Sequence, residues 1–161
     1  MRVNHLFVVV ATLALGACAT TMQNTVQTPL KPSMVVDIPM TFVSIRCVGH
    51  PGVTYIHDFY VKEPFSERMA GGLNCGGTVA AGYMLPRQWQ PGMKVKVRWK
   101  PNARDWIEKT TTIRRYEKAG TLYVHFFEND EVRVVSTPIH GPSNPNHPIP
   151  KSVIIAPPEE E

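Results

Sequence analysis

The chain has 161 residues, and 17 Lys and Arg against 13 Asp and Glu give it a formal net charge of +4 with histidines neutral. This length suffices for one domain with a real hydrophobic core and terminal segments. The mildly basic balance does not by itself indicate nucleic-acid binding, and no apolar run reaches the roughly 20 residues of a transmembrane helix.

The N-terminus has the parts of a secretory signal peptide. Arg2 supplies a positive charge, residues 6–15 form an apolar run broken only by Thr12, and small residues follow. The run has about half the length needed to cross a hydrocarbon core. We therefore expect residues 1–17 to be removed, which lowers the net charge to +3 because Arg2 is lost.

The end of this segment, Leu15-Gly16-Ala17-Cys18, resembles the bacterial lipobox. The resemblance implies lipidation of Cys18 and attachment to the cell envelope on the periplasmic side. The competing interpretation is a secreted protein with a chance cysteine at the boundary. Ala19 follows, whereas an aspartate there would resemble the inner-membrane retention signal of enteric bacteria, so the outer membrane is favoured.

Three further segments differ in composition. Residues 18–39 are polar and interrupted by prolines, which is typical of a tether, and twenty such flexible residues would reach about 25 Å. Residues 40–137 are rich in β-branched and aromatic runs. Residues 138–161 hold seven of the fifteen prolines and end in three glutamates. This proline-rich tail should be extended, either lying on the domain or disordered.

The central segment predicts an all-β domain. Runs separated by Gly and Pro predict about seven strands, at residues 41–46, 53–61, 76–84, 93–100, 106–116, 122–127 and 132–135. The last two flank a polar stretch of four residues, which indicates a hairpin. Residues 64–72 are expected to form a loop, with a short helix near 66–69. The pattern predicts a single antiparallel β-sandwich or a barrel-like domain.

The clearest strand pattern lies at residues 93–100, where apolar and basic residues alternate strictly. The inward residues would be Met93, Val95, Val97 and Trp99, and the outward residues Lys94, Lys96, Arg98 and Lys100. The basic row could bind an acidic protein patch or lipid phosphates, or it could protect an exposed sheet edge from aggregation. Trp89 and Trp106, near turns, could be interface anchors or core residues.

Two cysteines remain after lipidation, Cys47 and Cys75. In an oxidising compartment an even pair favours a disulfide, whose loop of about 29 residues would contribute about 3 to 4 kcal/mol. The alternative is a buried thiol together with a reactive Cys75 in the glycine-rich stretch 71–77. A thiol–imidazole pair of Cys75 with His57 has no support from spacing.

Catalytic and metal-binding motifs are absent from the sequence. There is no nucleophile elbow, no zinc-protease pair and no phosphate-binding loop. The histidines have no metal-ligand spacing and are interpreted as surface or hydrogen-bonded residues: His50, His57, His125, His140 and His147. We therefore expect neither catalysis nor a cofactor or metal.

Several motifs resemble a family of small proteobacterial lipoproteins catalogued as a domain of unknown function. They are the stretch 49–60 (GHPGVTYIHDFY), the glycine cluster around Cys75, the run 85–99 (LPRQWQPGMKVKVRW), the hairpin at 124–135 and the PNHP of residues 145–148. Members often carry two adjacent cysteines after the glycine pair, whereas this chain has only Cys75. The family's disulfide pattern is therefore not carried over.

Relatives of this kind are often associated with type VI secretion phospholipase effectors, so the resemblance implies an immunity protein that binds and occludes such a toxin. Two other interpretations remain. One is an accessory lipoprotein that scaffolds another envelope component, and the other is a hydrolase with an active site that the motif search does not detect. An immunity role would require a protein toxin as partner, the membrane as anchor, and no nucleic acid.

Overall fold

The computed structural model describes residues 37–102 and 104–160. The expected signal peptide, the lipidation site Cys18 and nearly all of the tether lie outside the described residues. Within the described part of the chain, no helix is long and apolar enough to cross a membrane.

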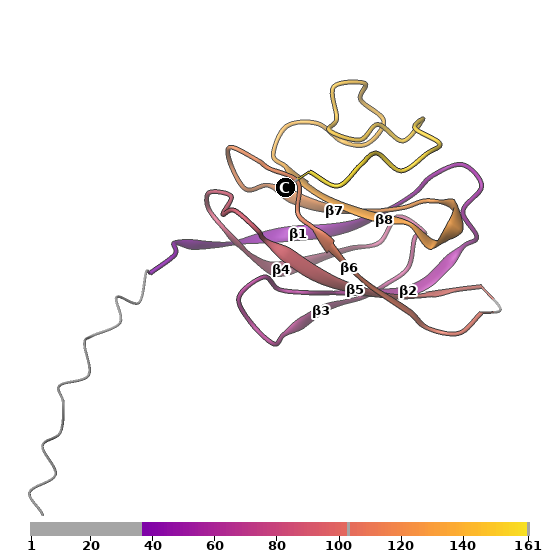
Figure 1. Ribbon diagram of the computed structural model, residues 1–161, viewed down its shortest axis with the longest axis horizontal. Helices are drawn as coiled ribbons and strands as arrows, with labels where there is room; N and C mark the ends of the chain where they lie inside the picture. Colours follow the sequence, from indigo (N-terminus) through magenta and orange to yellow (C-terminus); the bar gives the residue numbers. More distant parts are fainter. Residues whose placement is uncertain (1–36, 103, 161) are drawn as a thin grey trace, which may run out of the picture. The chain divides into compact units, whose positions relative to one another are not determined.

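The described chain forms eight strands in two four-stranded sheets, which confirms an all-β fold of the sandwich type (Figure 1). The sheets do not close into a barrel. Sheet A has the order β4-β1-β7-β8 and sheet B the order β3-β2-β5-β6. The strands are β1 (Met40–Gly49), β2 (Ile56–Lys62), β3 (Met69–Leu73), β4 (Val79–Pro86), β5 (Lys94–Pro101), β6 (Ile107–Thr112), β7 (Thr121–Phe126) and β8 (Val132–Thr137).

Most neighbouring strands are antiparallel, but one pair is parallel. β1 pairs antiparallel with β4 and parallel with β7, with Ile45 opposite Leu122 in the latter pair. β7 and β8 form the predicted hairpin, whose polar connection contains a short 3-10 turn, η1 (Glu128–Asp130). The sequence predicted only antiparallel pairing and did not predict the parallel pair. No hairpin joins β1 to β7, and sequence periodicity does not specify pairing between distant strands.

Residues 64–68 form part of the expected loop, but β3 (Met69–Leu73) replaces the rest of it, and no helix forms near 66–69. The five residues of β3 include Gly71 and Gly72 and no β-branched side chain, so the usual strand signal is absent. Gly71 has a φ of +148°, and a Cβ at that position would collide with the backbone oxygen of Phe59 in β2. Glycine therefore lets β3 approach β2 closely, and the same residue hides the strand from propensity analysis.

The core lies between the inner faces of the two sheets. β5 supplies Val95, Val97 and Trp99 to it, in the predicted alternation, and its basic residues face outward. Trp99 meets Phe126 of sheet A with ring centroids 5.4 Å apart, and Phe59 meets the same ring at 5.7 Å. These aromatic contacts tie sheet B to sheet A.

The predicted disulfide is confirmed. Cys47 of β1 is bonded to Cys75, which follows β3, with a Cα–Cα distance of 5.0 Å. Both residues pack against the core. The bond therefore links the two sheets, and the interpretations of Cys75 as a reactive thiol or as a partner of His57 are wrong.

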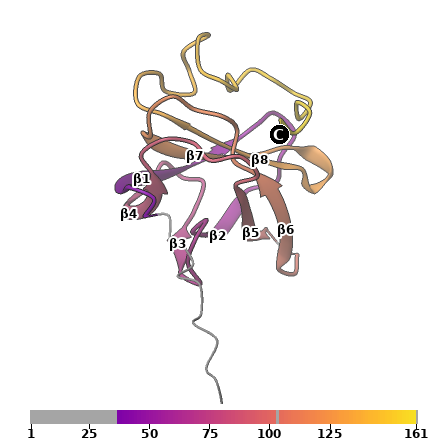
Figure 2. The same ribbon diagram turned by 60° about the vertical axis from the view of Figure 1, so that its left-hand side comes forward.

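The proline-rich tail lies on the domain and not in solution. Its described residues, 138–160, pass over the outer face of sheet A, where the yellow segment lies beside β7 and β8 in both views (Figures 1 and 2). Ile149 is 3% exposed and packs with Tyr123, Phe127 and Val135 in a second hydrophobic cluster. The tail therefore covers the outer face of sheet A at β7 and β8, whereas Phe42 of β1 and the outer side chains of β5 in sheet B are exposed.

Candidate functional site

The predicted basic row lies on the outer face of sheet B. Its four members are exposed: Lys94, Lys96, Arg98 and Lys100. β5 pairs with β2 on one side and with β6 on the other, so it is an interior strand. The interpretation of the row as edge protection is therefore wrong, because edge protection requires a strand with unpaired backbone groups.

Trp106 belongs to the same face. The register of β5 and β6 places Arg98 opposite Glu108, and the guanidinium carbon of Arg98 lies 4.5 Å from the centroid of the Trp106 ring. Tyr60 of β2 lies on the other side of β5, with its ring centroid 6.0 Å from that of Trp106. The indole is 39% exposed. This arrangement holds a large aromatic ring at the surface beside a cation, as many protein-binding sites do.

The charge of this face is only partly compensated. Lys96 forms an ion pair of 2.8 Å with Glu108. Lys94, Arg98 and Lys100 form no ion pair with any carboxylate of the described residues. Lys100 lies opposite Asp58 in the register with β2. The face thus has an excess of positive charge, which would attract an anionic surface. We call it the sheet B face, defined by Tyr60, the four basic residues of β5, and Trp106.

Trp89, the other predicted anchor, lies elsewhere. It is only partly exposed and packs against the core between the sheets. Its indole nitrogen donates a hydrogen bond of 2.8 Å to the carbonyl oxygen of Ile113. Of the two interpretations of Trp89, the structure places it with the core, and only Trp106 joins the basic row.

A cluster of three buried histidines, which the sequence did not reveal, lies under the tail. His50 follows β1, His125 is in β7 and His147 is in the tail, and their exposed fractions are 4%, 0% and 3%. The His125 ring centroid lies 5.1 Å from that of His50 and 5.2 Å from that of His147. The three residues are far apart in sequence, so no spacing signal could have grouped them.

The hydrogen bonds define which ring nitrogen carries the proton in two of the three histidines. His50 Nδ1 donates to the carbonyl oxygen of Val153, so His50 Nε2 accepts the hydrogen bond of 2.8 Å from His125 Nδ1. His125 Nε2 is then a buried acceptor with no hydrogen-bond partner among the described residues, and His147 Nε2 has none either. Burial lowers the pKa of His125 well below 6.5, and it also lowers the pKa values of His50 and His147. The cluster is therefore built to stay neutral.

This cluster attaches the tail to sheet A. His50 stacks on Phe127 at 3.9 Å between centroids, and His147 meets the edge of Tyr123 at 4.9 Å. In the part of the chain that the structure describes, no group of three His, Cys, Asp or Glu residues is arranged to hold a metal ion. The described contacts are those of packing and of hydrogen bonding between tail and sheet.

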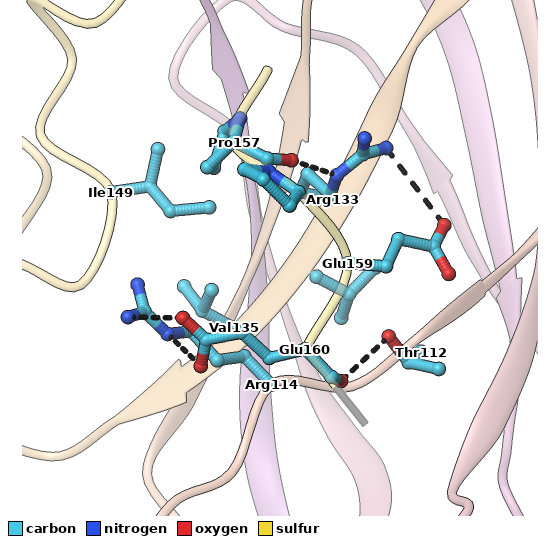
Figure 3. A pocket seen from close by; sticks show the side chains of 10 residues that line it. Thr112, Arg114, Arg133, Val135, Ile149, Pro157, Glu159 and Glu160 are labelled. Atoms are coloured by element: carbon cyan, nitrogen blue, oxygen red, sulfur yellow. Dashed lines mark hydrogen bonds and ion pairs between the residues drawn. The ribbon is translucent and has the colours of Figure 1, made fainter.

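Two arginines hold the last described residues of the tail (Figure 3). Arg114 binds the carboxylate of Glu160 through Nε at 2.8 Å and through its terminal nitrogen at 2.6 Å. Arg133 of β8 donates a hydrogen bond of 2.6 Å to the carbonyl oxygen of Pro157 and lies 3.8 Å from Glu159. Only about 20 Å³ remains between these groups. The space around Arg114 and Arg133 is therefore filled by the chain's own tail.

A polar cavity of about 270 Å³ lies at one end of the sandwich, between the loops that follow β1, β5 and β7. Its charged pair is Arg104 with Asp130, joined by two hydrogen bonds of 2.7 Å. The hydrogen bond from Arg104 lowers the pKa of Asp130. The carboxylate is thus held ionised and paired, which does not suit a general base.

Comparisons with known proteins give one match. No curated protein matches the chain, and no solved structure does. The model of the family described as "Protein of unknown function (DUF3304)" matches residues 50–134, which run from the end of β1 into β8 and include the whole of sheet B. This match covers more than half of the chain, and the chain therefore belongs to the DUF3304 family.

Proposed function

We propose that this protein is an envelope-anchored lipoprotein that binds and neutralises a periplasm-targeted protein toxin, a type VI secretion phospholipase effector, by occlusion. The anchoring part of the proposal rests on the signal peptide and on the lipobox ending at Cys18. The toxin-binding part rests on the family resemblance described above. Occlusion requires no catalysis by the protein itself.

The observation that carries the binding role is the sheet B face. Its basic residues lie on an interior strand, so protection of a sheet edge does not explain them. In addition, Arg98 lies against the partly exposed ring of Trp106. Tryptophan and arginine are, with tyrosine, the residues enriched among the energetically dominant contacts of protein interfaces. The surrounding positive charge would accelerate encounter with an acidic surface on the toxin.

The envelope anchor adds to this binding. A protein held at the membrane meets a toxin at the place where a phospholipase must act, and tethering raises its effective concentration there. A face that covers the substrate entrance or the membrane-docking surface of the toxin would stop hydrolysis without altering the active site. Inhibition should therefore be stoichiometric.

The test is a titration of the toxin's phospholipase activity with this protein, after the partner has been identified by affinity capture from the parent strain. We expect activity to fall to zero near equimolar mixing. Charge reversal of the row, Lys96→Glu with Arg98→Glu, should weaken inhibition at least tenfold and remove most of its salt dependence. The matched control is Arg115→Glu with Lys118→Glu, which makes the same charge change at exposed positions outside the sheet B face.

Two results would contradict the proposal. If the row variant inhibits as well as the unchanged protein at low salt, the sheet B face is not the interface. If capture retains only abundant envelope proteins and no secreted enzyme, the accessory role is favoured instead. In that role the same face would scaffold another envelope component, and deletion would cause an envelope defect without any toxin.

A further inference from the structure

A patch of apolar side chains lies on the outer surface where the described chain begins. Phe42 of β1 is 70% exposed and Phe65, in the loop between β2 and β3, is 55% exposed. Ile38, Met40 and Met84 complete the patch and line, together with Phe65 and the polar residues Glu63 and Ser66, a groove of about 340 Å³. We call these five residues the N-terminal apolar patch. Exposed phenylalanines beside an apolar groove are unusual on a surface that contacts only water.

The register of sheet A explains why these side chains share one surface. Phe42 lies opposite Met84, and Met40 lies opposite Pro86, in the antiparallel pair of β1 and β4. Residues opposite each other point to the same side of a sheet, and here the neighbouring positions Val43 and Tyr83 point to the core. Phe42 and Met84 therefore point away from the core, and Phe42 has no covering element.

The patch does not serve strand addition, because the adjacent edge of β4 is already sealed. The buried carboxylate of Glu63 accepts a hydrogen bond of 3.0 Å from the backbone nitrogen of Met84. Arg68, which is paired with Glu63, donates a hydrogen bond of 2.7 Å to the carbonyl oxygen of Gly82. A partner would therefore contact the side chains of the patch and not the backbone of β4.

The patch lies beside the point where the envelope anchor joins the domain. The described chain begins at Asp37 and enters β1 at Met40, at the start of the strand (Figure 1). Only residues 19–36 separate this point from Cys18, and even a fully extended chain of that length spans about 60 Å. A lipid on Cys18 would therefore hold the start of β1, and the N-terminal apolar patch beside it, within about 60 Å of the bilayer.

The charges around the patch suit an anionic lipid surface. Arg46 and Arg87 are exposed, and neither forms an ion pair within the described residues. The carboxylate of Glu63 is buried and compensated by Arg68. The exposed acidic residues nearby are Asp37, at the chain entry, and Glu67, which follows Phe65 in its loop and is paired with Lys62. Apolar side chains that enter the interface, flanked by arginines near lipid phosphates, are the elements of interfacial binding.

We infer that the N-terminal apolar patch docks on the phospholipid surface to which the anchor attaches the protein. This inference rests on the proposed lipidation of Cys18 and not on the identity of the toxin. Docking through this patch fixes the orientation of the domain on the membrane. The sheet B face, which belongs to the other sheet, then stays open to a partner.

The test uses the mature lipidated chain in vesicles of phosphatidylethanolamine and phosphatidylglycerol. Because Cys47 and Cys75 are bonded to each other and Cys18 would carry lipid, an introduced cysteine is a unique labelling site. An environment-sensitive fluorophore is attached to Phe65→Cys in one sample and to Lys96→Cys, on the sheet B face, in the control. We expect the label at position 65 to be quenched several-fold more by nitroxide-labelled lipids than the label at position 96.

A second variant tests whether the quenching at position 65 depends on the apolar patch and not on the attached label alone. Phe42→Ser in the Phe65→Cys chain removes the most exposed member of the patch, and it should lower the quenching at position 65 at least twofold. Equal quenching at positions 65 and 96 would overturn the inference. A change at position 65 only on addition of the toxin would also overturn it, because the patch would then be a protein interface.

The same samples separate this inference from the proposed function. The intact mass of the mature chain reports whether Cys18 carries lipid, and a chain without lipid would overturn both the anchoring and the docking. A lipidated chain that inhibits the toxin but shows no preferential quenching at position 65 would overturn the docking alone. A chain that docks but inhibits no phospholipase would overturn the immunity role alone.

Discussion

Arg98 of β5 lies against the ring of Trp106, with 4.5 Å between the guanidinium carbon and the ring centroid. The contact joins a cation of the central strand to an aromatic residue just before β6, and it holds both side chains in place before any partner arrives. Side chains that are already ordered lose less conformational entropy on binding. The pair is therefore suited to binding more than to stability.

This pair gives the first prediction. Trp106→Ala should weaken binding of the partner at least tenfold, since truncated interface tryptophans commonly cost about 2 kcal/mol or more. The free energy of unfolding should fall by only about 1 to 2 kcal/mol, because Trp106 is 39% exposed and only part of its apolar area is buried. Calorimetric titration and urea unfolding measure the two effects. Tyr55→Ala, at an aromatic that is 46% exposed outside the sheet B face, is the control and should bind normally.

The disulfide gives the second prediction. Cys47→Ala with Cys75→Ala should lower the free energy of unfolding by about 3 to 4 kcal/mol, because the bond closes a loop of about 29 residues. Urea unfolding of the oxidised protein and of the double variant measures the difference. A loss below about 1 kcal/mol would mean that the hydrophobic contacts between the sheets, and not the bond, hold them together.

The sequence predicted the four strands of sheet A, all strands of sheet B except β3, and the disulfide, because their signals are local or chemical. The strict alternation of β5 identified its inner and outer faces, and the compartment implied by the signal peptide favoured pairing of Cys47 with Cys75. The basic row was identified as well, but the sequence did not predict whether its strand, β5, lies at the edge or in the interior of the sheet. That distinction depends on pairing between distant strands, which periodicity does not contain.

The features that the sequence did not predict depend on close approach or on long-range contact. β3 was missed because Gly71, which permits its pairing with β2, has no side chain to give a strand signal. The histidine cluster was missed because the parallel pairing of β1 and β7 brings His50 to His125, and only the tail brings His147 to them. Proline content indicated that the tail is extended, but it could not show that Ile149 has an apolar site on sheet A.

The third prediction concerns Glu63, which is 1% exposed and bonded to Arg68, Ser66 and the backbone of Met84. Glu63→Gln should destabilise the protein by about 1 to 3 kcal/mol, because it replaces one oxygen of the buried carboxylate with an amide NH2 that cannot accept a hydrogen bond, and it removes the charge that pairs with the half-exposed Arg68. Glu67→Gln is the matched control. Glu67 also forms an ion pair, with Lys62, but its side chain is 94% exposed. The control should unfold at the same urea concentration as the unchanged protein.

The fourth prediction asks whether apolar or ionic contacts hold the tail. Ile149→Ala should cost about 2 to 4 kcal/mol, because the side chain is 3% exposed in the second hydrophobic cluster. Glu160→Gln should cost less than about 1 kcal/mol, because the ion pair with Arg114 is partly exposed and screened. Hydrogen exchange of residues 147–156 should rise strongly in the first variant and little in the second. The reverse order would identify the arginine contacts as the main attachment.

The fifth prediction concerns pH, because the histidine cluster is neutral where it is buried. Burial lowers the pKa values of His50, His125 and His147, so below pH 6.5 the unfolded chain binds protons that the folded chain does not. The free energy of unfolding therefore falls as the pH decreases from 7 to 5, by about 2 kcal/mol for His125 alone. Nearby charges oppose protonation further, namely Lys151 for His50 and His140 for His147.

Protonation should act on the tail first. A proton on His50 Nε2 would break its hydrogen bond with His125, and a proton on His125 Nε2 would be buried without an acceptor under the tail, so protonation favours release of the tail. We expect hydrogen exchange of residues 147–156 to increase at pH 5 before the rest of the domain unfolds. His125→Gln should flatten the pH dependence by up to about 1.4 kcal/mol per pH unit, whereas His57→Gln, at an exposed histidine outside the cluster, should not. A tail that exchanges equally at pH 5 and pH 7 would show that its attachment does not depend on neutral histidines.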